Sequence, residues 1–272
     1  PRSYVTLARE TCVAIKRRVP NAFVTGPAAA QMPTVWRPKK PLMQALLNDK
    51  ALLNCLDALS LHTHRFGQTP ETVSRDYAVL RDNYLAAWPP TIPHKPIVDT
   101  EWGDTVYRSG ISEDVQALWL PRMFLVNLME QVNLTNWYCL MDTGDNDTEM
   151  EDRFGLVRSD GTMRPSFRAY QTLSREIGGM SLRETIARFD PATAKGVTIL
   201  RFCDQAEQQC KLVVWTTEMD GAPQKVTVPG WRRSGPAIDH LGRRDVSQPD
   251  TNGVLELLPK PSVSYVPVTV AR

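Results

Sequence analysis

The chain has 272 residues, of which 42% are hydrophobic, and its formal net charge is only +2. This composition predicts a folded protein with a substantial core. Its basic residues are scattered among acids, which argues against a nucleic-acid-binding surface, and no stretch of about 18 apolar residues predicts a membrane span.

The first part of the chain alternates helical and strand-like patterns. Apolar residues at helical spacing from Tyr4 to Ile15 predict a first helix. A short strand at 22–26, a helix at about 41–57 and a second strand at 58–62 follow. Alternation of this kind is typical of repeated βα units over a parallel sheet, so we expect an α/β fold.

The same alternation continues to about residue 175. Apolar residues at 73–84 predict a helix, and a further helix is expected over 111–131, where Pro121 should either kink it or mark its true start. A fourth strand is expected at about 135–140, and a last helix near 165–174.

Past residue 178 the pattern changes to short strands and turns, for example at 197–200 and 211–215. Alternating strands of this kind predict a second, all-β domain. We therefore expect two domains, residues 1–178 and residues 179–272.

Five cysteines show no CxxC pair and no Cys/His spacing suited to zinc, so we expect neither a metal site nor a cofactor. Cys203 and Cys210 flank a polar turn and could face each other across a hairpin, which leaves a disulfide and free thiols as alternatives. For Cys12, Cys55 and Cys139 we expect buried free thiols.

Residues 95–103, KPIVDTEWG, form a short apolar strand pattern that ends in a carboxylate beside an aromatic residue and a glycine. In a parallel α/β barrel, functional side chains lie at the carboxyl ends of the strands. Glu101 is therefore the leading catalytic candidate. Asp99 shares its face of the strand, and because an unpaired buried carboxylate is costly, we expect Asp99 to meet a cation or a histidine such as His62, or to be protonated.

Residues 100–103, TEWG, together with the order of elements, resemble the clan A retaining glycoside hydrolases, whose barrels carry the nucleophilic glutamate on strand seven. Residues 60–66, SLHTHRF, are similar to the strand-six segment that ends in His-x-Tyr, and residues 137–156 look like strand eight and its loop. Residues 160–167 resemble the entry to the last helix, and the trailing β part looks like the accessory sandwich of families near 39 and 5.

This resemblance implies a partial (β/α)8 TIM barrel, running from helix four to helix eight, followed by a small all-β sandwich. The first half of the barrel would then be a missing partner of this chain. A retaining β-glycosidase uses two carboxyl groups roughly 5 Å apart. Glu101 would be the nucleophile, and the acid/base glutamate, in an Asn-Glu-Pro motif, would lie upstream. We therefore expect the chain alone to be inactive.

The resemblance also implies substrate contacts. In the family a strand-six tyrosine orients the nucleophile; that position here is Phe66, which cannot donate a hydrogen bond, and His64 is its possible substitute. Trp137 and Tyr138 are candidates for a sugar platform, with a buried barrel tryptophan as the alternative for Trp137. The remaining candidate substrate-binding residues are Trp102 and Asp142.

Two functions remain open at this point. One is hydrolysis of O-glycosyl bonds in an oligosaccharide or polysaccharide, with no choice among sugars. The other is a non-catalytic carbohydrate-binding or scaffold protein derived from a glycosidase, which Phe66 in place of tyrosine and Leu140 in place of tryptophan favour. The chain starts at Pro1 without a leader, as a processed product or a fragment would, and we expect a secreted or periplasmic protein, with a cytoplasmic location still open.

Overall fold

The structure is a computed structural model that describes residues 2–29, 41–86, 94–219, 224–246 and 254–271. The chain forms two compact units. Unit 1 consists of Pro1–Arg65, Val73–Gly103 and Glu130–Tyr138, and unit 2 of Phe66–Thr72, Asp104–Met129 and Cys139–Arg272. The expected boundary at residue 178 falls inside unit 2, so the division into residues 1–178 and 179–272 stays a prediction.

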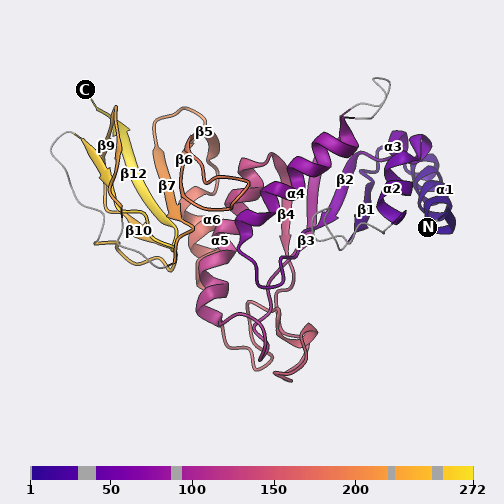
Figure 1. The fold of residues 1–272 in the computed structure, drawn as a ribbon, viewed down its shortest axis with the longest axis horizontal. Helices are drawn as coiled ribbons and strands as arrows, with labels where there is room; N and C mark the ends of the chain where they lie inside the picture. Colours follow the sequence, from indigo (N-terminus) through magenta and orange to yellow (C-terminus); the bar gives the residue numbers. More distant parts are fainter. Residues whose placement is uncertain (1, 30–40, 87–93, 220–223, 247–253, 272) are drawn as a thin grey trace. The chain divides into compact units, whose positions relative to one another are not determined.

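Unit 1 is built on a parallel sheet with the strand order β1-β2-β3-β4 (Figure 1). The strands are β1 (Thr25–Ala29), β2 (Ala58–His62), β3 (Ile97–Trp102) and β4 (Val132–Trp137). Each strand pairs with its neighbour in chain order, as βα units require. The parallel α/β pattern predicted from the sequence is confirmed, although β1 starts three residues later than expected and β4 three residues earlier, because pairing with the neighbouring strand, rather than hydropathy, sets where a strand begins.

Helices α1 (Arg2–Arg18), α2 (Pro41–Asn48), α3 (Lys50–Cys55) and α4 (Val73–Val79), the last extended by the π-helical turn η2 (Leu80–Leu85), complete unit 1. The single helix expected at 41–57 is two helices. Asp49 separates them as the N-cap of α3, where its carboxylate accepts a hydrogen bond from the backbone N–H of Leu52 at 2.8 Å. A capping aspartate offers the chain a local alternative to continued helix, which the apolar spacing alone does not reveal.

A disulfide joins Cys12 of α1 to Cys55 of α3, 43 residues apart in the sequence. The expectation of free thiols at these two positions was therefore wrong. The pairing follows from the packing of α1 against α3, which buries Cys12 to 2% exposure and also pairs Arg9 with Asp49 at 2.9 Å. Sequence spacing carries no signal for such a contact.

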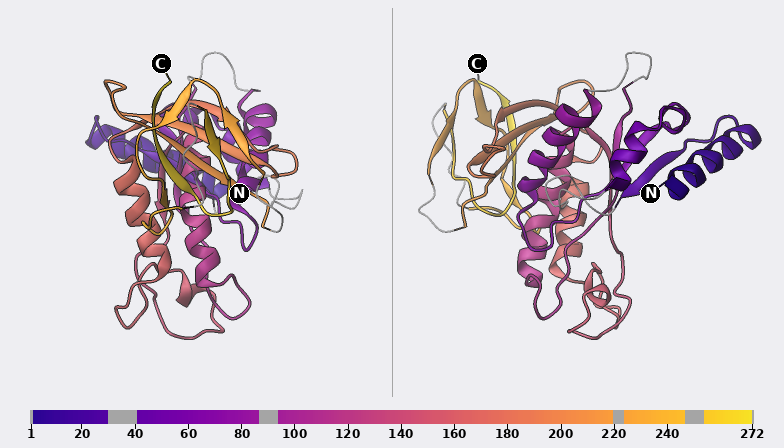
Figure 2. Two further views of the ribbon diagram at one scale, coloured as in Figure 1. Left: turned by 90° about the vertical axis from the view of Figure 1, so that its left-hand side faces the viewer. Right: turned by 45° about the vertical axis from the view of Figure 1, so that its right-hand side comes forward.

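The helical elements of unit 2 are η1 (Pro70–Thr72), α5 (Glu113–Met129), η3 (Glu151–Arg153) and α6 (Pro165–Ile177). Helices α5 and α6 pack side by side (Figure 2). Pro121 lies inside α5, so it does not mark the start of the helix. The residues on both sides of Pro121 are buried, and this packing holds the helix together across a residue that cannot donate a backbone hydrogen bond.

Every element described after residue 178 is a strand. They are β5 (Ser181–Ala187), β6 (Val197–Cys203), β7 (Cys210–Thr216), β8 (Val226–Val228), β9 (Trp231–Arg233), β10 (Ile238–Asp239), β11 (Leu255–Leu257) and β12 (Ser264–Val270). One antiparallel sheet has the order β10-β12-β7-β6-β5 with β9 beside β12, and β8 pairs with β11 in a second one. The disulfide left open by the sequence is formed between Cys203 and Cys210 at the β6–β7 hairpin.

A hydrophobic cluster contains side chains of both antiparallel sheets, including Leu212 and Val214 of β7 together with Leu255 of β11. Because side chains alternate along a strand, Trp215 lies on the other face of β7. It is fully buried there, and its indole N–H donates to a carboxylate oxygen of Glu71 at 2.9 Å. Strand β7 is therefore buried on both faces, against the cluster on one side and against η1 on the other.

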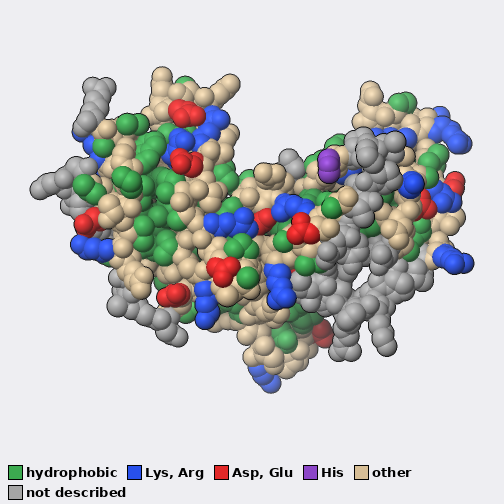
Figure 3. Space-filling view, turned by 45° about the horizontal axis from the view of Figure 1, so that its top comes forward, with side chains coloured by type: hydrophobic (Ala, Val, Ile, Leu, Met, Phe, Trp, Pro, Cys, Tyr) green, Lys and Arg blue, Asp and Glu red, His purple; other side chains and the backbone are tan. Residues whose placement is uncertain are grey.

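The surface carries charges of both signs. On the face shown in Figure 3, basic and acidic side chains lie interspersed rather than segregated. No described helix is both long enough and apolar enough to cross a bilayer.

Candidate functional site

Glu101 stands at the carboxyl end of β3 in unit 1. Strand β3 runs parallel to β2, with Asp99 opposite Leu61, but the register then shifts and places Glu101, rather than Thr100, opposite His62. This irregularity brings the carboxylate of Glu101 across from the end of β2. The side chain of Glu101 is 33% exposed, whereas Asp99 is fully buried. Glu101 is thus the acid of this strand that can meet a ligand from solvent.

Two histidines from the end of β2 flank this carboxylate. His64 Nε2 lies 3.0 Å from one oxygen of Glu101, and His62 Nδ1 lies 3.6 Å from the other. The second ring nitrogen of His64, Nδ1, lies 2.9 Å from the carbonyl oxygen of Gly103. Each oxygen of Glu101 therefore faces one imidazole, and the His64 ring is held at both of its nitrogens.

The environment of His62 favours its neutral form. Burial lowers the pKa of His62; the carboxylate of Glu101 opposes this effect, and the proximity of His64 adds to it. The balance is a lowered pKa, so His62 faces Glu101 chiefly as a neutral imidazole.

A buried hydrogen-bond network fixes the backbone that carries the two histidines. The hydroxyl of Thr63 donates to Asp99 and is also hydrogen-bonded to Tyr77, whose own pKa is raised well above its usual value by burial. Arg65 Nε donates to the carbonyl of Thr63 at 2.9 Å, and Arg65 pairs with Asp76 at 2.5 Å. Since Arg65, Asp76 and Asp99 are buried, these contacts hold the segment rigidly.

The sequence suggested His62 as a partner for Asp99. In the structure His62 lies beside Glu101 instead, and the hydroxyl of Thr63 donates to Asp99. Alternation along a strand assigns Thr63 to the face opposite His62 and His64. Strand β2 ends at His62, however, so alternation no longer governs Thr63. Thr63 was missed for this reason, and the contacts of this segment with Tyr77 and Asp76 of α4 were not predicted either.

Among the predicted aromatic contacts, Tyr138 is the one whose place beside the histidines is shown. The Tyr138 ring meets the His64 ring edge to face, with centroids 6.4 Å apart and an interplanar angle of 84°. The backbone N–H of Tyr138 donates to the backbone carbonyl of Trp102 at 2.9 Å. Trp137, half-buried, pairs in register with Trp102. Trp102 is fully buried, and in the described part of the chain its indole N–H has no hydrogen-bond partner. This burial favours a core role for Trp102.

The two other predicted substrate-binding residues, Phe66 and Asp142, belong to unit 2. Phe66 is 55% exposed and has a left-handed backbone with φ of 49°. Asp142 accepts two hydrogen bonds from Arg164, at 2.7 and 2.6 Å, and one from the N–H of Gly155 at 2.8 Å. Its side chain is 1% exposed, so the contacts seen here orient the loop; a role of Asp142 in substrate binding stays a prediction.

Chemically, the arrangement in unit 1 is a partly exposed carboxylate aimed by neighbouring side chains, which suits a nucleophile or a general base. The described residues hold no group of three or more His, Cys, Asp or Glu side chains arranged to bind a metal ion.

The chain was compared with known protein families, curated proteins and solved structures. No protein-family model and no curated protein matches the sequence. The fold itself, with its parallel sheet and antiparallel sheets, is similar to that of glycoside hydrolases of solved structure.

Three of these structures illustrate the similarity. The whole chain aligns with a family 39 glycoside hydrolase from the gut symbiont Bacteroides cellulosilyticus WH2, with a TM-score of 0.68 and 19% identity, over 62% of that chain. An α-L-arabinofuranosidase from Thermotoga maritima matches 97% of this chain with a TM-score of 0.62 and 15% identity, over 61% of its own length. A glucosidase from Croceicoccus marinus matches 98% with a TM-score of 0.61 and 13% identity, over 64% of its own length.

Proposed function

We propose that this chain is the nucleophile-bearing part of a retaining β-glycosidase that hydrolyses O-glycosyl bonds in an oligosaccharide or polysaccharide. The observation that carries the proposal is the placement of Glu101: it lies at the carboxyl end of a parallel strand, one-third exposed, with an imidazole at each oxygen. A retaining nucleophile must be accessible and aimed, and this geometry meets both needs. The glycoside hydrolase fold supports the same assignment.

In the proposed reaction, an oxygen of Glu101 attacks the anomeric carbon and forms a glycosyl ester while the bond to the leaving oxygen breaks. A second carboxyl group protonates that oxygen and then deprotonates the water that cleaves the ester, which restores the Glu101 carboxylate. We place this second group in a barrel half outside the chain, in agreement with the expectation that the chain alone is inactive.

A barrel half as partner agrees with the sheet of unit 1. Four parallel strands stand in chain order, whereas a complete barrel of this kind has eight. Among the described residues, β1 pairs with β2 alone, so one of its edges is open. The chain also spans only about three fifths of the length of the solved structures that it resembles.

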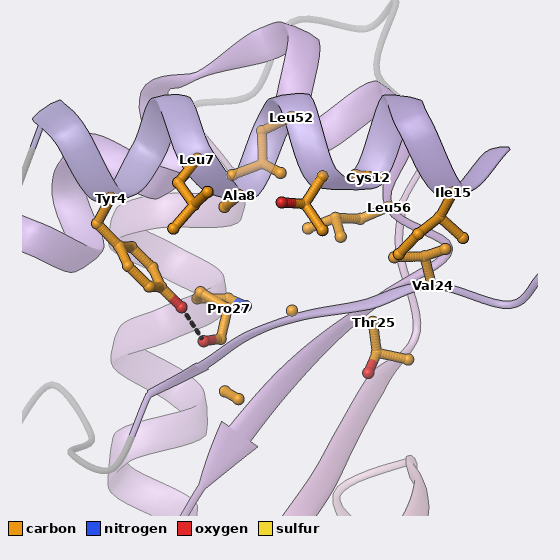
Figure 4. A pocket seen from close by; sticks show the side chains of 13 residues that line it. Tyr4, Leu7, Ala8, Cys12, Ile15, Val24, Thr25, Pro27, Leu52 and Leu56 are labelled. Atoms are coloured by element: carbon orange, nitrogen blue, oxygen red, sulfur yellow. Dashed lines mark hydrogen bonds between the residues drawn. The ribbon is translucent and has the colours of Figure 1, made fainter. Parts of the chain in front are cut away.

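An apolar groove lies beside this open strand. It has a volume of about 340 Å³ and runs between α1 and the β1 segment, and it is also lined by Leu52 of α3 and by Leu56, the C-cap residue of that helix (Figure 4). Tyr4 and Leu7 point from α1 into the groove, and the Tyr4 hydroxyl donates to the carbonyl of Pro27 at 3.2 Å. Leu7 is 62% exposed in this chain, as expected of an apolar side chain that a strand of the missing barrel half would cover.

An open strand beside an apolar groove predicts self-association of the chain in the absence of its partner. Leu7→Lys places a charge in the groove and should shift the chain toward the monomer, whereas Val270→Lys, at a residue that is 60% exposed in unit 2, serves as the matched control. Light scattering after size-exclusion chromatography reports the mass. A wild-type chain that stays monomeric at high concentration would argue against a barrel half as partner.

Covalent trapping tests the nucleophile directly. A 2-deoxy-2-fluoroglycosyl fluoride carries a leaving group that needs little protonation, so Glu101 can be glycosylated even without the acid/base carboxyl. The panel includes glucosyl, xylosyl and arabinofuranosyl reagents, because the solved neighbours include a glucosidase, a xyloglucanase and an arabinofuranosidase. Mass spectrometry of the digested protein then locates the added sugar.

We expect the label on the peptide that contains Glu101 and its loss in Glu101→Gln. Glu256→Gln is the matched control, since the Glu256 side chain is 30% exposed, close to the 33% of Glu101, and sits on a strand of unit 2. The control should label like the wild type. A label on another carboxylate, or the same yield in Glu101→Gln, would contradict the assignment.

The alternative is a non-catalytic carbohydrate-binding or scaffold protein. Phe66, which cannot donate a hydrogen bond to a nucleophile, is the observation that favours it. This alternative predicts that oligosaccharides bind in titration calorimetry while no reagent of the panel labels the chain when it is assembled with its partner half.

We further propose a secreted or periplasmic location. Two disulfides, Cys12–Cys55 and Cys203–Cys210, are compatible with an oxidising compartment. Mass spectrometry of the protein from its native source, alkylated without reduction, should show four of the five cysteines protected.

A further inference from the structure

The hydrogen bond from His64 to Gly103 determines which ring nitrogen carries a proton. The carbonyl oxygen of Gly103 can only accept, so His64 Nδ1, at 2.9 Å from it, must be the donor. In a neutral imidazole the other nitrogen then has no proton. Nε2 would present a lone pair to the oxygen of Glu101 that lies 3.0 Å away.

Two acceptors at this distance repel each other, and a carboxylate has no proton to offer. A favourable contact therefore needs one proton between His64 Nε2 and Glu101. Because Glu101 is 33% exposed, water stabilises its ionised form, and a charge-assisted hydrogen bond is stronger than a neutral one. We infer that His64 is an imidazolium that donates to the ionised Glu101, and that it is the residue that orients this carboxylate.

The other titratable groups around the pair are consistent with this assignment. His62, on β2, faces the second oxygen of Glu101, and its lowered pKa favours the neutral form. Of the two histidines beside Glu101, His64 is therefore the one that we expect to carry the positive charge. Asp99, beneath Glu101 on β3, is bound by the hydroxyl of Thr63. Tyr138, after β4, presents its ring to His64 edge to face.

The consequence for catalysis rests on the proposed function. A tyrosine donates to a nucleophile as a neutral group over a wide range of pH, whereas His64 donates to Glu101 only while it is charged. The orienting hydrogen bond is therefore present at low pH and lost when His64 gives up its proton as the pH rises. The rate at which Glu101 is glycosylated should consequently fall at high pH, and this basic limb of the pH profile should depend on His64.

Nitrogen NMR tests the protonation state without any reference to activity. The chain has only four histidines, so ¹⁵N-histidine labelling gives few signals, and His64→Gln and His62→Gln assign the site. In mildly acidic buffer we expect both ring nitrogens of His64 to be protonated, and Glu101→Gln to lose this doubly protonated signal at the same pH. A neutral His64 protonated only at Nδ1 beside an ionised Glu101 would overturn the inference, and so would a doubly protonated signal that Glu101→Gln leaves unchanged.

The trapping reagent tests the orienting role. The amide of His64→Gln can donate without a charge, so this variant should keep labelling at rates near wild type and lose the basic limb. His64→Phe cannot donate and should slow labelling by about 100-fold, the effect of misplacing a reacting group by about 1 Å. A basic limb that persists in His64→Gln, or equal rates in the Phe and Gln variants, would refute the role. If the wild type is not labelled at all, the proposed function fails while the NMR result still decides the protonation state.

Discussion

Replacing Arg122 by methionine should cost unit 2 much of its stability. Arg122, on α5, makes a bidentate ion pair with Glu71 of η1, at 2.8 and 2.6 Å, and both side chains are fully buried. The same carboxylate accepts the indole N–H of Trp215 on β7 at 2.9 Å. These three groups tie η1, α5 and the antiparallel sheet to one another.

The magnitude follows from what Arg122→Met leaves behind. Glu71 would remain buried without its cation, and breaking a buried ion pair in this way costs about 3–5 kcal/mol. At about 2–4 °C per kcal/mol for a unit of this size, the melting temperature should fall by roughly 6–20 °C. In the double variant Glu71→Leu with Arg122→Met neither charge of this pair is left, so part of this loss should be recovered; about 1–3 kcal/mol remains for the unpaired N–H of Trp215.

Thermal unfolding followed by circular dichroism measures the effect, with Arg108→Met as the matched control. Arg108 pairs with Asp147 on the surface, with side chains 68% and 52% exposed, so its loss should cost at most about 1 kcal/mol. An Arg122→Met variant as stable as this control would refute the argument. A double variant less stable than Arg122→Met alone would show that the residual charge on Glu71 is not the source of the loss.

The two disulfides and one buried histidine give further predictions. Loop-closure entropy suggests that the Cys12–Cys55 bond, across 43 residues, stabilises by about 4 kcal/mol and the Cys203–Cys210 bond, across 7, by about 2 kcal/mol; paired serine variants in chemical denaturation should show this order, and the reverse order would contradict it. Burial lowers the pKa of His240, so the unfolded state binds its proton more readily. Stability should therefore fall as the pH drops below about 6.5, the ordinary pKa of histidine, and His240→Gln should reduce this dependence; an unchanged pH profile of unfolding would refute the assignment to His240.

The sequence predicted the parallel sheet and the acid at its edge because both depend on local patterns. The apolar run before Glu101 and the alternation of strands and helices need only neighbours in the chain to be interpreted. Boundaries within these patterns were less well predicted. Asp49 splits one expected helix through a capping hydrogen bond. Pro121 lies inside α5, where the residues on both sides of it are buried.

The environment of Glu101 depended on contacts that no spacing in the sequence encodes. The resemblance assigned the orienting position to Phe66 and offered His64 as a substitute, and the structure places His64 at Glu101. The substrate contact expected of Asp142 stays a prediction, but its ion pair with Arg164, 22 residues further along the chain, was not predicted.

The sequence by itself determined that this is an α/β protein with a carboxylate at the tip of a strand, because periodic apolar residues and strand ends are properties of the local chain. Only the tertiary structure decided what that carboxylate meets. A register shift of one residue between β2 and β3 places Glu101 across from His62, and the strand end beyond His62 turns Thr63 toward Asp99. Pairing between strands is a long-range choice made by packing and hydrogen bonds together, and a shift of one residue changes every partner beyond it.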